Sequence, residues 1–180
     1  TFGSGKGGNL TVDAKDMQLI GTSADGQISS GLFSYTQPNS TGDAGDLAIK
    51  TNTLLVKDGA QVTASAYGGS GKGGNLTVTA DKVLLFNSSP ADSRFNSLSV
   101  QNERGAGDAG NLTIKTGELL VRDGSQISAA TFGGGKSGNL TVNADKMQLI
   151  GITADGKFPS GLAASTNRGA TGDAGNLTIN

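Results

Sequence analysis

The chain has 180 residues and a formal net charge of −1, and it contains no cysteine and no histidine. The missing cysteine excludes a disulfide framework and a thiolate metal site, and the missing histidine removes the commonest general base and the commonest metal ligand. The near-neutral charge gives no electrostatic footprint for nucleic acid, and no apolar run approaches the ~20 residues that span a bilayer as a helix.

One short phrase, Gly-Asn-Leu-Thr followed by Val or Ile, recurs along the whole chain. It provides one anchor residue for each repeat, and the anchors are Asn9, Asp46, Asn75, Asn111, Asn139 and Asn176. Successive anchors are 37, 29, 36, 28 and 37 residues apart, so long units of 36–37 residues alternate with short units of 28–29. Periods of this size are typical of solenoids, propellers and other repeat arrays.

Each complete unit contains three segments that have the alternating apolar pattern and the β-branched residues of strands. In chain order the expected strands cover residues 10–12, 17–20 and 32–35; 47–49, 54–56 and 61–66; 76–78, 83–86 and 98–100; 112–114, 119–121 and 126–130; 140–142, 147–150 and 162–164; and 177–179. No segment sustains a 3.6-residue period, so we expect almost no helix.

Three strands per unit with glycine-rich corners predict an all-β fold, a parallel β-helix (β-solenoid) of about five to six coils. Residues at equal positions in successive units would then stack about 4.8 Å apart. The expected internal columns are Leu10, Leu47, Leu76, Leu112, Leu140 and Leu177, and Val12, Ile49, Val78, Ile114, Val142 and Ile179. A propeller fits less well, because its blades need four strands in about 40–45 residues.

The long units differ from the short ones by insertions of about ten residues before the third strand, at 21–30, 87–96 and 151–160. Loops held by a rigid scaffold are the usual place for recognition. The candidate recognition residues are Asp25, Gly26, Gln27, Asp92, Ser93, Arg94, Asp155, Gly156 and Lys157. The alternative is that these loops only cover an apolar flank of the protein.

The remaining polar patterns favour structural roles. The Asn/Asp anchors predict a structural ladder at a corner, because Asn and Asp bond readily to neighbouring backbone groups. Gly-Asp-Ala-Gly, with Asp43, Asp108 and Asp173, returns only every 65 residues, so its carboxylates would lie too far apart to share a calcium ion. Gly-Lys corners at Lys6, Lys72 and Lys136 are expected to be solvated. We therefore expect no metal site and no cofactor.

Catalysis is not expected either. The chain has only two glutamates, Glu103 and Glu118, in different coils, and polysaccharide-cleaving sites need paired carboxylates. Asp92, Arg94, Glu103 and Arg104 form the only charged group that no other unit repeats. Solvated loop charges are the simpler interpretation, and a polysaccharide-binding or polysaccharide-cleaving β-helix remains the alternative.

The tandem units Gly-Asp-Ala-Gly-Asn-Leu-Thr-Ile (107–114) and Leu-Leu-Val-Arg-Asp-Gly-Ser-Gln-Ile-Ser (119–128) resemble the repeats of filamentous-haemagglutinin-like exoproteins, particularly the cyanobacterial ones. The resemblance covers residues 1–180 and includes no functional-site motif. It implies a right-handed parallel β-helix, secretion across a Gram-negative outer membrane with a partner protein in that membrane, and a role as a surface adhesin or filament.

We therefore expect a single β-solenoid segment over residues 1–180, cut from a longer repeat protein, because the chain starts and stops inside repeats. Its expected function is that of a structural shaft in a secreted or cell-surface protein, without catalysis. The expected location is extracellular. Possible partners are a carbohydrate or other cell-surface ligand, and further copies that associate end to end to form an extracellular fibre.

Overall fold

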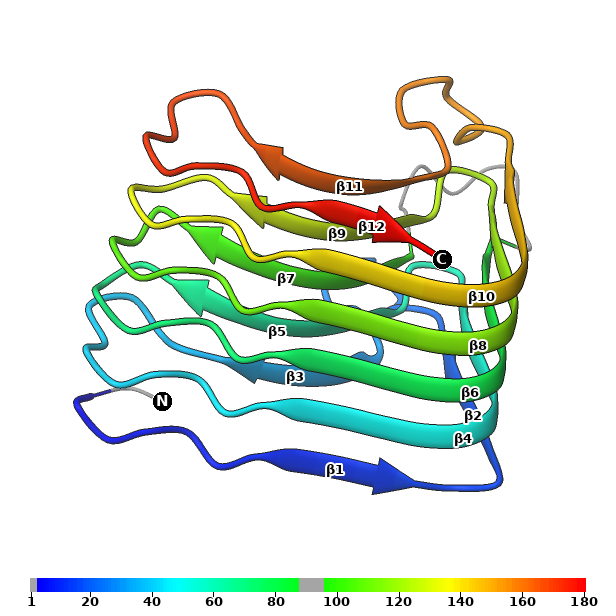
Figure 1. The fold of residues 1–180 in the computed structure, drawn as a ribbon, viewed down its shortest axis with the longest axis horizontal. Helices are drawn as coiled ribbons and strands as arrows, with labels where there is room; N and C mark the ends of the chain where they lie inside the picture. Colours follow the sequence, from blue (N-terminus) through cyan, green and yellow to red (C-terminus); the bar gives the residue numbers. More distant parts are fainter. Residues whose placement is uncertain (1–2, 88–95) are drawn as a thin grey trace.

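The computed structural model describes residues 3–87 and 96–180, which form twelve β-strands and no helix. In particular, this described part contains no helix of the length and hydropathy that a membrane span requires. The strands form two sheets in which every neighbouring pair is parallel, and the coils of chain lie on top of one another (Figure 1). The architecture is therefore all-β and consistent with a β-solenoid.

The chain alternates between the two sheets. The seven-stranded sheet contains β1 (Leu10–Asp13), β4 (Leu47–Lys57), β6 (Leu76–Phe86), β8 (Leu112–Arg122), β10 (Leu140–Ile150) and β12 (Leu177–Ile179) in that spatial order, with β2 (Asp16–Ile20) also on β4. The five-stranded sheet contains β3 (Gly31–Tyr35), β5 (Gln61–Tyr67), β7 (Ser97–Glu103), β9 (Gln126–Thr131) and β11 (Gly161–Thr166). Each circuit of the chain therefore extends both sheets.

The strand registers confirm the predicted internal columns. Leu47 lies opposite Leu10 and Leu76, and the same pairing continues through Leu112 to Leu140 and Leu177. The Val/Ile column that starts at Val12 follows the same register two residues later. The central members of both columns are fully or almost fully buried. Repeat spacing alone thus predicts which side chains form the core.

The prediction of three separate strands per unit agrees with the structure only in the first unit, where β1 and β2 are distinct. In later units the first two segments join into strands of 11 residues, β4, β6, β8 and β10. At the joint in β4, Asn52 is exposed and Thr53 is half-buried, so the alternation changes phase between buried Thr51 and buried Leu54. Pairing with β6 continues on both sides of this point. The chain therefore turns a corner without interrupting the ladder.

Close approach of stacked coils explains one column of glycines, which consists of Gly8, Gly45, Gly74, Gly110, Gly138 and Gly175. A Cβ atom on Gly110 would overlap the carbonyl oxygen of Gly74 in the coil below, and the same overlap recurs at each later member of the column. The backbone angle at these positions is ordinary, so the requirement for glycine comes from the spacing between coils and not from φ.

We predict that Leu112→Ala lowers the free energy of unfolding by about 2–5 kcal/mol, because it opens a cavity in a fully buried column. The matched control is Thr113→Ala, since Thr113 faces outward in a file where Ala48 already replaces threonine. The control should change stability by no more than about 0.5 kcal/mol. Urea unfolding followed by circular dichroism measures both, and equal effects would contradict the assignment of the core.

Gly110→Ala should destabilise the protein by about 1–3 kcal/mol, because the coils on either side must separate locally to admit the methyl group. Gly134→Ala is the control, since a Cβ atom there would lie 3.6 Å from the nearest atom, the Thr171 hydroxyl oxygen. The midpoints of thermal unfolding should rank Gly110→Ala below Gly134→Ala. A reversed ranking would exclude the tight coil-to-coil contact.

Candidate functional site

The loop at 21–30, the first candidate recognition loop, uses its aspartate internally. One carboxylate oxygen of Asp25 accepts hydrogen bonds from the Ser23 hydroxyl and from the backbone N–H of Gln27. Gly26 has a φ of 71°, in the left-handed region that favours glycine, and its N–H donates to the Ser23 carbonyl. Asp25 and Gly26 therefore shape the loop, and Gln27 is the member of this triplet whose side chain is available for other contacts.

The loop at 151–160 is built in the same way. The carboxylate of Asp155 accepts hydrogen bonds from the Thr153 hydroxyl at 2.6 Å and from the Lys157 backbone at 3.1 Å. Lys157 Nζ lies 3.0 Å from the other carboxylate oxygen, and Gly156 has a φ of 75°. All three candidate residues of this loop thus contribute to its own conformation.

The Thr153 hydroxyl has a measurable consequence for Asp155. Its hydrogen bond, with smaller contributions from the side chain and backbone of Lys157, lowers the pKa of Asp155 from 3.8 to about 2. A carboxyl group whose pKa is lower in the folded state than in the unfolded state stabilises the fold at pH values above its unfolded-state pKa. This contribution is lost as the pH falls through the folded-state pKa. The loop should therefore keep its internal bonds until the pH approaches 2.

The candidate residues of the middle insertion, Asp92, Ser93 and Arg94, lie outside the described residues. The described part of the chain brings no group of three or more acidic side chains together in a geometry that could hold a metal ion. The two described triplets, at 25–27 and 155–157, lie in separate loops whose aspartates bond within their own loop. Among them, Gln27 is placed beside an open groove.

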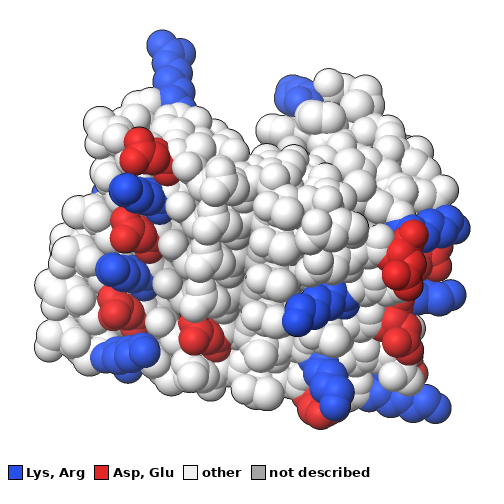
Figure 2. Space-filling model, in the orientation of Figure 1, with Lys and Arg blue, Asp and Glu red and all other residues white. Residues whose placement is uncertain are grey.

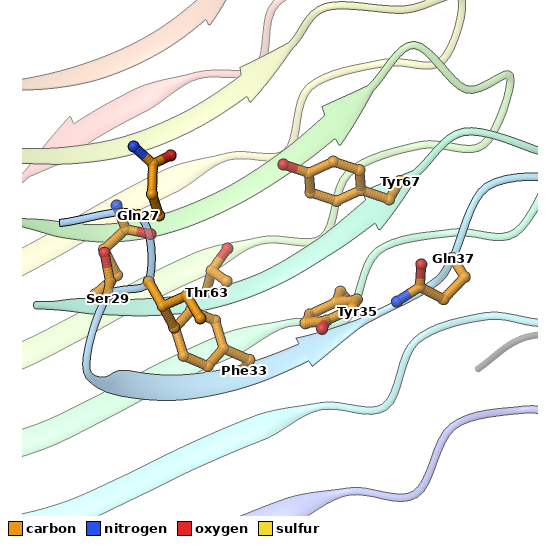
Figure 3. A pocket seen from close by; sticks show the side chains of 9 residues that line it. Gln27, Ser29, Phe33, Tyr35, Gln37, Thr63 and Tyr67 are labelled. Atoms are coloured by element: carbon orange, nitrogen blue, oxygen red, sulfur yellow. The ribbon is translucent and has the colours of Figure 1, made fainter. Parts of the chain in front are cut away.

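The groove crosses the outer face of the five-stranded sheet at β3 and β5 and has a volume of about 580 Å³. It is lined by Gln27, Ile28, Ser29, Phe33, Tyr35, Gln37, Gln61, Thr63 and Tyr67. Figure 3 shows Gln27, Ser29 and Phe33 toward one end and Gln37 at the other, with Tyr35 and Tyr67 between them. The groove is therefore elongated, and this volume falls within the range of small-molecule sites.

Three aromatic rings form the apolar part of the groove. Phe33 and Tyr35 point outward from β3, because the intervening and flanking side chains turn toward the core. Their ring centres lie 6.4 Å apart in an edge-to-face arrangement, and Tyr67 of β5 lies 6.2 Å from Tyr35. The three rings remain 41–45% exposed, so they form an open platform on the sheet.

Tyr67 of β5 lies directly beside Glu103 of the neighbouring strand β7, because the two residues are partners in the strand register. Burial raises the pKa of Tyr67 above its ordinary value, and the Glu103 carboxylate, to which the phenol donates a hydrogen bond, raises it further. Glu103, one half of the carboxylate pair considered for catalysis, thus supports an aromatic ring. The phenol stays protonated at neutral pH.

The polar part of the groove consists of uncharged groups. The side-chain amides of Gln27, Gln37 and Gln61 make no hydrogen bond to any residue that the structure describes. The hydroxyl group of Thr63 already has two hydrogen-bond partners. Its Oγ1 lies 2.7 Å from Ser65 Oγ and accepts a hydrogen bond from the Ser99 hydroxyl. The carboxamides are therefore the donors and acceptors that a ligand would meet first.

Sequence reasoning missed this groove, although one signal was present. The chain has two tyrosines in all, and both of them lie in the groove. They belong to different units, Tyr35 to a long one and Tyr67 to a short one, so their proximity follows from the stacking register between β3 and β5. The anchor spacing predicts that register, and the outward-facing columns of the same register bring the two tyrosines together.

The anchor column forms a continuous chain of side-chain-to-backbone hydrogen bonds. Each anchor's side-chain Oδ1 accepts the backbone N–H of the next anchor, at 2.8–3.0 Å in all five steps. Asp46 can replace asparagine in this column, because the ladder needs only an acceptor oxygen. The Asp46 carboxylate also accepts a hydrogen bond from the side-chain amide of Asn75 at 3.0 Å. The arrangement uses the anchors for stacking and leaves no row of free amide acceptors for a ligand.

A second column of charged residues runs along the glycine-rich corner, as alternating red and blue atoms at one edge of Figure 2. Its members are Lys6, Asp43, Lys72, Asp108, Lys136 and Asp173. Asp108 shows the pattern: its carboxylate lies 3.7 Å from Lys72 Nζ in the coil below and accepts the Lys136 N–H in the coil above. The lysines, predicted to be only solvated, therefore lie between the aspartates and separate them.

Comparison with protein-family models, with curated proteins and with solved structures gives no match to this chain.

Asn111→Ala should lower the free energy of unfolding by about 1 kcal/mol, because the N–H of Asn139 loses its acceptor. Asn111→Asp keeps the acceptor, as Asp46 does, and should cost less than the alanine variant. Amide hydrogen exchange at Asn139 provides a local measurement alongside urea unfolding. If exchange at Asn139 is equally slow in both variants, the side-chain ladder contributes nothing to stacking.

Thr153→Val should raise the pKa of Asp155 from about 2 toward 3.8, since it removes the hydroxyl donor and keeps the shape of a buried side chain. Titration of the carboxyl carbon by NMR measures this pKa directly. Lys157→Met is the control, because it removes a smaller contribution and leaves the hydroxyl in place. An unchanged pKa in Thr153→Val would show that the hydroxyl does not bond to the folded carboxylate.

Proposed function

We propose that this chain is a structural shaft, a rigid β-solenoid segment of a secreted or cell-surface filament or adhesin. We assign it no catalytic role. The observation that supports this best is the unbroken stacking order, in which core leucines, corner glycines and anchor side chains each repeat from coil to coil. Such one-dimensional stacking gives length and stiffness by adding identical contacts.

The finer description belongs to the same proposal. The coils form a right-handed parallel β-helix of about five to six coils, with alternating long and short units. The repeats belong to the filamentous-haemagglutinin-like type found in cyanobacteria, and an outer-membrane partner exports the protein to the surface of a Gram-negative cell. Repeat style and the parallel architecture support this description.

A second candidate is polysaccharide binding, which the aromatic groove on β3 and β5 favours. Polysaccharide cleavage has less support than polysaccharide binding, because cleavage needs two cooperating carboxylates. Glu103 bonds to Tyr67, and its proposed partner Asp92 lies outside the described residues. A third candidate is end-to-end assembly of copies into an extracellular fibre, which unpaired strand edges would favour.

Immunogold electron microscopy of cells that produce the protein tests the shaft directly. An antibody raised against this repeat segment should place gold particles along thin fibres at the cell surface. Cells in which the gene is disrupted provide the control. Gold confined to the medium or to the cytosol would overturn the surface-shaft proposal and would bring the carbohydrate-active candidates forward.

A further inference from the structure

We propose that the groove on the outer face of β3 and β5 binds a neutral oligosaccharide, with the chain lying along β3. This inference rests on the second candidate function, polysaccharide binding, and names the class of saccharide. It is independent of the shaft proposal, since a stack of coils needs no exposed aromatic platform. It also does not use the loop triplets predicted from the sequence, apart from Gln27. It rests on the lining of the groove, on its lack of charge, and on its restriction to one end of the sheet.

The rings of Phe33, Tyr35 and Tyr67 provide the first half of the recognition chemistry. A sugar ring has a face of C–H groups that packs on an aromatic ring, whereas its edge carries hydroxyl groups. The three rings remain 41–45% exposed and lie 6.2–6.4 Å apart, so they present successive apolar surfaces along the groove. Aromatic contacts of this kind contribute through both buried area and ring electrostatics.

The carboxamides of Gln27, Gln37 and Gln61 provide the second half. Each carboxamide has one acceptor oxygen and two donor hydrogens, which suits hydroxyl groups that both donate and accept. The amides lie among the rings and at both ends of the row, as Figure 3 shows for Gln27 and Gln37. A few polar groups on an otherwise apolar lining are typical of a site that orients its ligand.

The charge of the lining selects among ligands. None of the nine lining residues is an Asp, Glu, Lys or Arg, and the phenol of Tyr67 keeps its proton at neutral pH. The Glu103 carboxylate, which accepts a hydrogen bond from the Tyr67 phenol, lies next to the groove and would repel an acidic polysaccharide. A polyanion would bind at clustered cationic groups, which this lining does not provide. The geometry therefore points to an uncharged saccharide.

The outward columns of the same sheet show that the platform is a local addition to the scaffold. The register from Phe33 leads through Thr63, Ser99 and Ser128 to Ala163, and the column of Tyr35 contains Ser65 on β5. The coil thus accepts small side chains at these positions, and stacking does not require the rings.

These columns also supply substitutions that the fold already tolerates. The test variant is Phe33→Ala combined with Tyr35→Ser, which introduces the residue types found at Ala163 and Ser65 in the same columns. The control is Phe132→Ala, because Phe132 is also 41% exposed and does not line the groove. Circular dichroism and thermal unfolding should show that both variants fold like the unmodified chain.

The measurement is isothermal titration calorimetry with three probes: a β-1,4-linked glucose hexasaccharide, an α-1,4-linked glucose hexasaccharide, and an acidic galacturonate hexasaccharide. We expect saturable binding of at least one neutral probe, and an affinity that is at least about tenfold lower in the double variant. The control variant should bind within about twofold of the unmodified chain.

Three results would overturn the inference. The first is no binding of either neutral probe at millimolar concentration, and the second is binding that the double variant leaves unchanged. The third is a preference for the acidic probe. Sedimentation velocity adds one more test, because a dimer that the double variant converts to a monomer would identify the groove as an interface between copies. None of these outcomes depends on whether the protein forms a surface shaft.

Discussion

The vertical spacing between coils is the constraint on which the rest of this structure depends. Strands paired in parallel register place equivalent residues about 4.8 Å apart, so each side chain must be compatible with a similar one directly above it and below it. Leucine at position 76 requires an apolar neighbour at 112, and glycine at position 110 is required by the carbonyl oxygen of Gly74. The sequence repeats because each coil must satisfy this same constraint.

Polar groups satisfy the same constraint in two ways. The anchor column repeats one residue type, because an amide or carboxylate oxygen can accept the N–H of the next coil. The corner column instead alternates Lys with Asp, because identical charges at this spacing would repel each other. Exposed ion pairs contribute little stability individually, at about 0–1 kcal/mol. Their alternation keeps like charges from lying next to each other in successive coils.

The sequence predicts the scaffold better than the site, for a physical reason. The Leu and Val/Ile columns depend only on anchor spacing, and the register reproduces them from Leu10 to Leu177. The groove depends on what two different units place side by side, such as Tyr35 and Tyr67, which no single repeat contains. The loop triplets are predicted as recognition residues because loops on a rigid scaffold are the usual place for recognition. Asp and Gly are equally the residues that close a turn, as Asp155 and Gly156 do here.

Interstrand nuclear Overhauser effects measure the stacking register most directly, and the chain of 180 residues is small enough for complete assignment. We expect methyl contacts from Leu112 to Leu76 and to Leu140, and backbone contacts between Thr113 and both Thr77 and Thr141. We expect no contact between Leu76 and Leu140, which lie two coils apart at roughly 9–10 Å. Contacts that pair Leu112 with a residue outside its column, or that indicate antiparallel neighbours, would contradict the stacked parallel architecture on which every inference here depends.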